Sequence, residues 1–160
     1  MRIHHFFIAA ALVATTASAD ARPHRVVIGD FYGQAKLAHA GRAIAVTSVS
    51  DHCDIVSAKQ WSAAMSAAKG HGAERWSSAA TDTGVDAVIE GWISADGVRT
   101  PTMTIEVRDA STGRQIDTVT VRIGNDGNLD ERSTHKLATE LVELVEWAGS
   151  HEMIAPAFLN

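Results

Sequence analysis

Four consecutive residues hold the densest group of side chains that could bind a metal ion. Asp51, His52, Cys53 and Asp54 include the imidazole and thiol groups that zinc prefers. Neighbouring residues on a strand point to opposite faces of a sheet, so these side chains seldom chelate one ion together. The other histidines are scattered, with no tightly spaced second pair, and we therefore expect no metal site and no cofactor.

Carboxylates could support general acid–base catalysis. Asp30 ends a predicted strand, where open α/β sheets often place ligands, although a turn or capping role is more common for aspartate there. Asp86 and Glu90 share one face of a later strand with Val88 and Trp92, which indicates a partly solvated or helix-covered polar edge. No serine lies in a G-x-S-x-G turn, so we expect no catalytic residue and no enzyme activity.

The cysteine and the tryptophans are expected mainly to pack. Cys53 is the only cysteine and cannot form a disulfide within the chain. We expect a buried thiol at the start of a strand, with an intermolecular disulfide or a reactive thiol as the alternatives. The four tryptophans fall at periodic positions typical of the core. If one is exposed, we expect it to be Trp92, which lies on the strand face opposite Ile89 and Ile93.

Hydrophobic periodicity predicts the elements that position these residues. Strands are expected at 25–30, 53–56, 85–94, 102–108 and 118–123, and helices at 34–50, 58–69, 73–83 and between residues 128 and 149. This order predicts one mixed sheet of about five strands with helices packed on it, an α/β (α+β) sandwich. The first helix has a thin face of alanine and glycine, so something can pack close to it.

Local signals mark several boundaries. Ser57 and Gln60 have the spacing of a capping box, and Gly84 is expected to end a helix. Asn128 is predicted to cap the last helix, which Gly149 ends. Residues 96–97, an Asp-Gly pair, predict a hairpin turn, and the phase change near residue 117 predicts a bulge.

The first 19 residues predict export. Arg2 precedes the apolar run 6–14, and Ala17-Ser18-Ala19 has the small residues that a signal peptidase recognises. We expect cleavage after Ala19, a single domain at 20–149, a tail at 150–160 and a periplasmic location. Cys53 is too far from the cleavage site to carry a lipid anchor.

The charge balance excludes some partners. The chain has 160 residues and a formal net charge of −5 at pH 7. This mild acidity argues against binding to nucleic acid or to an anionic membrane surface. No apolar run after the leader reaches the roughly 20 residues of a membrane span, so we expect a soluble, unanchored protein.

Three segments carry a resemblance to a known family. They are an apolar strand ending in Asp-Phe at 26–31, the Gly-apolar-Asp strand at 84–91, and a hairpin with Asp-Ala-Ser-Thr-Gly-Arg at 105–114. In order and spacing they resemble the TolB amino-terminal-like domain, related to domains of curli-secretion lipoproteins and of lipoprotein activators of penicillin-binding proteins. The resemblance implies an envelope protein that binds other proteins and has no active site. It carries over no catalytic or ligand-binding residue.

The function expected from these observations is non-catalytic contact with an envelope protein. Trp92, Asp30, Phe31 and Glu90 form the expected interaction surface. An open sheet edge or the thin face of the first helix could also meet a partner. Two alternatives remain open: a small-ligand or metal-binding protein with its site near Asp30, and a hydrolase.

Overall fold

The computed structural model describes residues 22–95 and 100–150. The predicted leader with its cleavage site, the Asp-Gly turn at 96–97 and the end of the predicted tail lie outside these residues.

The described chain forms one mixed sheet and four helices. In chain order the elements are β1 (His24–Tyr32), α1 (Ala35–Val49), β2 (Cys53–Val56), α2 (Ala58–Ala67), α3 (Ala73–Thr83), β3 (Ala87–Ser94), β4 (Thr102–Asp109), β5 (Gln115–Arg122) and α4 (Glu131–Ser150). The strand order is β2-β1-β3-β4-β5. β1 is parallel to β2 and β3, whereas β3, β4 and β5 are antiparallel. The predicted fold class and element order are confirmed.

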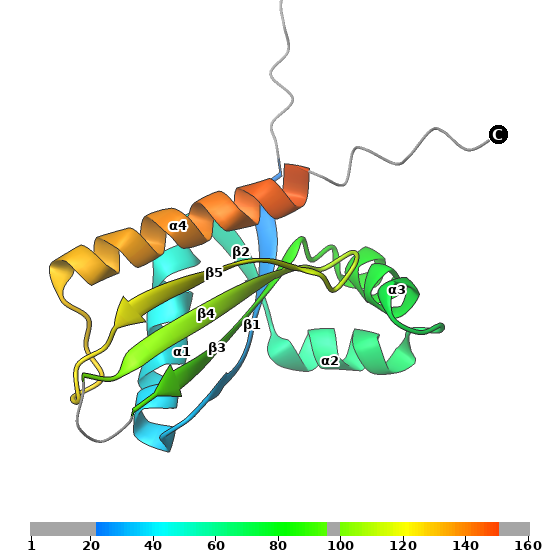
Figure 1. The fold of residues 1–160 in the computed structure, drawn as a ribbon. Coiled ribbons are helices and arrows are strands. Elements are labelled where there is room, and N and C mark those ends of the chain that lie inside the picture. Colours follow the sequence, from blue (N-terminus) through cyan, green and yellow to red (C-terminus); the bar gives the residue numbers. More distant parts are fainter. Residues whose placement is uncertain (1–21, 96–99, 151–160) are drawn as a thin grey trace, which may run out of the picture.

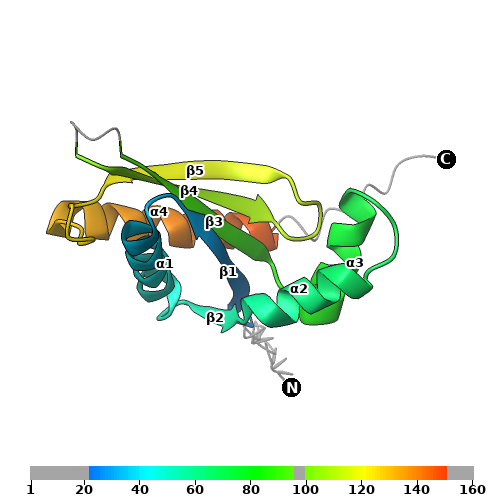
Figure 2. The ribbon, with the colours of Figure 1, turned by 90° about the horizontal axis from the view of Figure 1, so that it is seen from below.

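The helices cover the two faces of the sheet unequally. α1 and α4 lie together on one side of the sheet, and α2 and α3 lie beside the end where β3 begins (Figures 1 and 2). The main core forms under α1 and α4, where strand residues such as Ile28, Ile89 and Ile105 meet Leu37 and Leu141. A smaller cluster forms under α2 and α3 on the other side of the sheet. Its members include Val27, Val88, Trp61 and Ala79.

Small residues let α1 approach the sheet closely. Gly41 is buried, and a Cβ atom at this position would lie 2.8 Å from the Met103 sulfur and 3.2 Å from Phe31 Cδ1. The thin alanine and glycine face of the first helix is therefore part of the core. The expectation that it could receive a partner protein is wrong.

The predicted capping chemistry is confirmed at the start of α2 and the end of α3 and is wrong at the start of α4. The Ser57 hydroxyl accepts a hydrogen bond from the Gln60 amide, and Gly84 takes a left-handed conformation at the end of α3. The prediction of Asn128 as the cap of α4 is wrong. The Asp130 carboxylate accepts from the Ser133 amide at 2.7 Å, because an ionised carboxylate is a stronger acceptor for a free helix amide.

The predicted end of α4 differs from the structure, whereas the predicted bulge in β5 agrees with it. Gly149 does not end α4, which continues through Ser150. Residue 150 therefore belongs to the helix rather than to the predicted tail. The bulge predicted near Asp117 is confirmed, since the β4–β5 register shifts between Val107 and Arg108.

A buried carboxylate holds the start of β1 against the start of β3. The Arg25 amide donates to Asp86 Oδ2 at 2.8 Å, and the Arg22 guanidinium donates to Asp86 Oδ1 at 3.0 Å. The Asp86 amide donates in turn to the Arg25 carbonyl at 2.7 Å. Asp86 therefore anchors the two central strands.

A bulge in β1 changes which side chains face the core. Val26, Val27 and Ile28 pair with consecutive residues of β3, but the register then shifts before Phe31 pairs with Gly91. Two residues of β1, Gly29 and Asp30, therefore lie opposite the single residue Glu90. The bulge turns Phe31 toward α1, where its ring occupies the space that a Gly91 side chain would need.

We expect Gly91→Ala to destabilise the protein by about 1–3 kcal/mol, because the new methyl group overpacks the core against the Phe31 ring. Denaturant unfolding measures the change. Phe31→Leu in the same chain should recover part of the loss, with Phe31→Leu alone as the reference. Additive effects of the two substitutions would contradict this packing.

We expect Asp86→Asn to lower the free energy of unfolding by about 1–3 kcal/mol, because a carboxamide cannot accept from both donors. Asp82→Asn, at an exposed position of α3, is the matched control and should leave stability nearly unchanged. Equal effects of the two substitutions would show that the Asp86 carboxylate does not anchor the strands.

Candidate functional site

The half of the sheet away from α2 and α3 carries an uncovered face, here called the open face. It consists of the side chains of β3, β4 and β5 that alternate with the core residues, together with Tyr32 of β1. No described helix crosses in front of these strands (Figure 1). The members with the clearest chemistry are Tyr32, Glu90, Trp92, Thr104, Arg108 and Thr120.

Two aromatic side chains lie next to each other on the open face. Tyr32 is 58% exposed and Trp92 is 39% exposed, and the two residues are direct partners in the β1–β3 register. Thr104 pairs with Trp92 on the other side and shares a 3.3 Å hydroxyl contact with Thr120. The open face therefore presents aromatic surface on rigid strands, beside a row of hydroxyl groups.

Charged side chains occupy the middle of the open face. Glu90 and Glu106 are direct partners across β3 and β4, and the Arg108 guanidinium contacts both carboxylates. The distance from Arg108 Nε to Glu90 Oε2 is 3.8 Å. Arg108 Nη1 also donates to the Gly113 carbonyl at 3.1 Å. The arginine thus offsets the repulsion between two carboxylates that the strand register forces together.

Burial raises the pKa of Glu90 above its ordinary value. Arg108 lowers this pKa, whereas Glu106 and Asp30 raise it further. Glu90 lies over Gly29, where a Cβ atom would come within 3.0 Å of the glutamate Cγ. The glycine therefore leaves the space in which the Glu90 side chain lies against the sheet.

The structure separates the four residues of the predicted interaction surface. Trp92 and Glu90 lie on the open face, and Asp30 is exposed in the bulge of β1. Phe31 lies on the opposite face of the sheet, half-buried under α1. Tyr32 takes the place beside Trp92. Tyr32 is not among the predicted surface residues. In a regular strand its side chain would point toward the core, and only the bulge reverses this direction.

Helix cations occupy carbonyl groups of β1, where that strand extends beyond the end of β2, and of the edge strand β5. Arg42 of α1 donates to the Ile28 and Gly29 carbonyls at 3.0 and 3.1 Å. Lys136 of α4 donates to the Thr120 carbonyl at 3.2 Å. These carbonyls are not free to pair with an incoming strand, which favours the open face over these positions as the place where a partner binds.

The Asp51–Asp54 stretch is split as the strand geometry predicts. Cys53 is buried in the core, whereas Asp51, His52 and Asp54 are exposed. Burial raises the pKa of the Cys53 thiol to about 11, with a further contribution from nearby carboxylates. The thiol is therefore protonated and weakly nucleophilic at neutral pH. Within residues 22–95 and 100–150, no three His, Cys, Asp or Glu side chains are grouped closely enough to hold a metal ion.

The other tryptophans differ in their burial. Trp61 of α2 and Trp76 of α3 pack against each other, with ring centroids 5.6 Å apart. Trp147 on α4 is 47% exposed, so the expectation of a core position is wrong for this residue.

None of the helices in the described part of the chain has the length and apolar character required to cross a bilayer.

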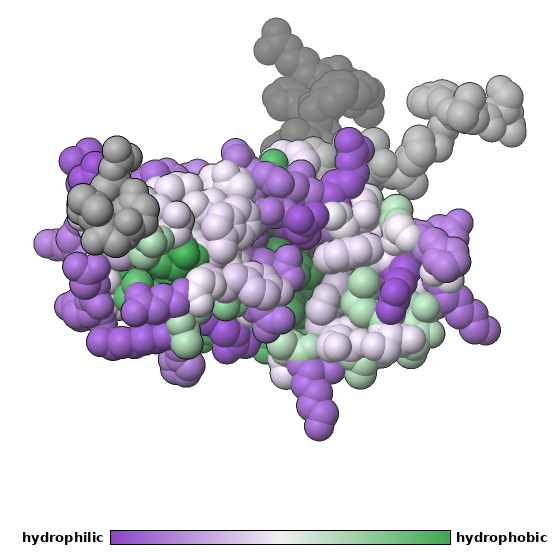
Figure 3. Space-filling model, turned by 60° about the horizontal axis from the view of Figure 1, so that its bottom comes forward, coloured by the Kyte–Doolittle hydropathy of each residue, from purple (hydrophilic) through white to green (hydrophobic). Residues whose placement is uncertain are grey.

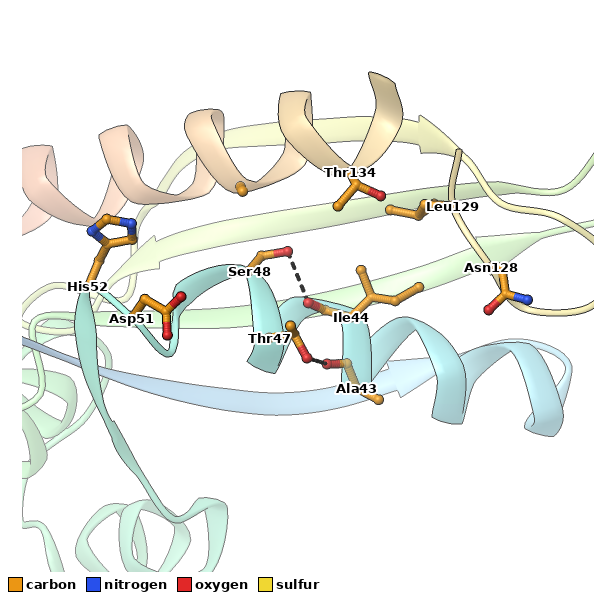
Figure 4. A pocket seen from close by; sticks show the side chains of 10 residues that line it. Ala43, Ile44, Thr47, Ser48, Asp51, His52, Asn128, Leu129 and Thr134 are labelled. Atoms are coloured by element: carbon orange, nitrogen blue, oxygen red, sulfur yellow. Dashed lines mark hydrogen bonds between the residues drawn. The ribbon is translucent and has the colours of Figure 1, made fainter. Parts of the chain in front are cut away.

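The surface also contains a groove between α1 and α4 (Figure 4). It has a volume of about 480 Å³ and is lined by residues of both helices and of the segment that precedes α4. Figure 4 shows Ser48 on the α1 side of the groove and Thr134 and Leu129 on the α4 side. No residue of the open face lines it.

Comparison with known proteins finds similar folds only among solved structures. No protein-family model and no curated protein sequence matches the chain. A PelC dodecamer from Paraburkholderia phytofirmans is 19% identical, with a TM-score of 0.48 over 78% of this chain and 89% of that chain. The LpoB C-terminal domain from Salmonella enterica is 14% identical, with a TM-score of 0.46 over 68% and 88%. Lipoprotein GNA1162 from Neisseria meningitidis is 13% identical, with a TM-score of 0.44 over 78% and 99%.

All three TM-scores lie below 0.5, so no property of this chain follows from these likenesses. None of the three is named as a TolB amino-terminal-like domain, and that resemblance stays a prediction from the sequence.

We expect Glu90→Gln to raise the thermal midpoint at pH 7. In the wild-type protein the folded state raises the Glu90 pKa, so ionisation of Glu90 opposes folding. This opposition is complete above the folded-state pKa and disappears below the unfolded-state value, about 4.3 for glutamate. The advantage of the glutamine variant should therefore shrink as pH falls through this window. Thermal unfolding from pH 7 to pH 4 measures it, and an advantage that grows toward low pH would contradict the assignment.

Proposed function

We propose that this chain is an exported, soluble domain that binds another protein of the bacterial envelope through its open face and catalyses no reaction. The observation that carries the proposal is the exposure of Tyr32 and Trp92 side by side on an uncovered sheet. Tyrosine and tryptophan are enriched at the centres of protein interfaces because they combine large apolar rings with a polar group.

The surroundings of the aromatic pair support a protein partner. Thr104 and Thr120 provide hydroxyl groups beside the rings, and Glu90 with Arg108 adds charges of both signs. A stable interface commonly has such an apolar centre with a polar rim. In the view of Figure 3, hydrophilic residues cover most of the surface and apolar residues appear in small areas between them. On the open face the exposed large hydrophobic side chains are Tyr32 and Trp92, so the proposed contact depends on these aromatic side chains rather than on a large apolar patch.

Two features of the sequence support the envelope as the location. Residues 1–19 have the order of charged, apolar and small residues that is typical of a cleaved export signal. Three segments resemble the TolB amino-terminal-like domain, whose relatives act in the envelope by binding proteins. Both features lead us to place the partner outside the cytoplasm.

A photo-crosslinking experiment tests the proposal. A photoreactive amino acid at position 104 of the full chain, expressed with its leader in a Gram-negative host, should crosslink reproducibly to one envelope protein. Intact mass of the periplasmic form should show a chain that begins at Asp20. With the partner purified, Trp92→Ala should weaken binding by about 30-fold, the effect of losing an aromatic anchor of about 2 kcal/mol.

Trp147→Ala is the matched control, since it removes an exposed tryptophan from α4 and should leave the affinity unchanged. Circular dichroism shows whether each variant is folded. Equal affinities of the wild-type and Trp92→Ala proteins would overturn the open face as the binding surface. An uncleaved chain retained in the cytoplasm would overturn the proposed location.

A further inference from the structure

The groove between α1 and α4 has the size and lining of a small-molecule site. Its volume of about 480 Å³ falls within the range of roughly 300–1,000 Å³ that ligand pockets occupy. Ala43 and Ile44 of α1 contribute apolar surface on one side, and Leu129 and Ala138 contribute it on the other. The groove lies away from the open face, so it is independent of the proposed partner surface.

Each hydroxyl group that lines the groove donates its proton to a backbone carbonyl of its own helix or of the residue before it. Thr47 donates to the Ala43 carbonyl at 3.1 Å, and Ser48 donates to the Ile44 carbonyl at 2.9 Å (Figure 4). Across the groove, Thr134 donates to the Asp130 carbonyl at 2.9 Å. A hydroxyl has a single proton, so each of these groups can offer a ligand only the lone pairs of its oxygen.

The other polar groups of the groove also favour a ligand that donates hydrogen bonds. Asp51 contributes a carboxylate, which accepts hydrogen bonds and donates none when ionised. Asn128 donates from Nδ2 to Asp126 at 2.7 Å, and its side-chain oxygen Oδ1 can accept. Among the described residues, no lysine or arginine lines the groove. His52 is the one lining side chain whose ring can donate or accept.

The end of the groove near Asp51 is electrostatically negative. Asp51 directly follows the last turn of α1, where the helix dipole places partial negative charge. α1 has no basic residue in its last turn to offset that charge. A negative helix end beside a carboxylate therefore favours a cation at this place.

From these observations we infer that the groove binds a small organic cation with an apolar body and a primary ammonium group. The ammonium donates to the Asp51 carboxylate and to the hydroxyl oxygens of Thr47 and Ser48. The apolar body lies along Ile44 and Leu129. Three ammonium protons match the acceptors at this end of the groove, whereas a carboxylate ligand would be repelled by Asp51 and could accept only from the His52 ring or from Asn128.

Titration of the ¹⁵N-labelled protein with three ligands of equal chain length tests the inference. n-Hexylammonium should shift the amide signals of Thr47, Ser48, His52 and Thr134, with a Kd on the order of 1 mM for so small a ligand. Hexan-1-ol should bind at least about tenfold more weakly, and hexanoate should give no shifts in the groove, because each lacks the ammonium charge.

Two variants locate the binding and separate charge from shape. Asp51→Asn should weaken hexylammonium binding by about tenfold, whereas Asp54→Asn, an exposed carboxylate outside the groove, should not change it. Ala43→Phe, at an exposed position of α1, should fill the groove and abolish the shifts while the remaining spectrum stays that of the folded protein. Three results would overturn the inference: hexanoate or hexanol binding as tightly as hexylammonium, equal affinities of Asp51→Asn and wild type, or no shifts in the groove at about 20 mM ligand, well above the expected Kd.

Discussion

The parallel pairing of β1 with β3 is the interaction on which the rest of the structure depends. It joins the half of the sheet formed by β2 and β1 to the antiparallel half formed by β3, β4 and β5. Asp86 holds the two strands at their start through hydrogen bonds to Arg22 and to the Arg25 amide. Phe31 packs over Gly91 farther along the pair. A polar anchor at one end and a steric fit at the other therefore define its register.

The bulge within this pairing determines which side chains of β1 reach each face of the sheet. It turns Phe31 into the core under α1 and places Tyr32 beside Trp92 on the open face. The same strands thus contribute to the core on one side and to the proposed interface on the other. α2 and α3 cover only the end of the sheet where β3 begins. The aromatic and charged side chains on the rest of this face therefore stay accessible.

Much of the fold could be predicted because its signals are local. The alternation in β4 and the hydrogen bond from the Gln60 amide to the Ser57 hydroxyl depend on residues a few positions apart, and both appear as expected. The candidate site was predictable only in part. Trp92 was identified from its place opposite Ile89 and Ile93, whereas Tyr32 was missed because one inserted residue in β1 reverses the direction of its side chain. The choice of Asp130 over Asn128 as the cap of α4 likewise depends on competition between nearby acceptors.

The sequence by itself determined the order of strands and helices and the apolar face of each, since periodicity records which side chains must leave water. Only the tertiary structure decided which half of the sheet stays uncovered, that Glu90 faces Glu106 with Arg108 between them, and that α1 and α4 enclose a groove lined by acceptors. These features join residues far apart in the chain. Their geometry depends on strand register and helix packing, which the periodicity of a single segment does not specify.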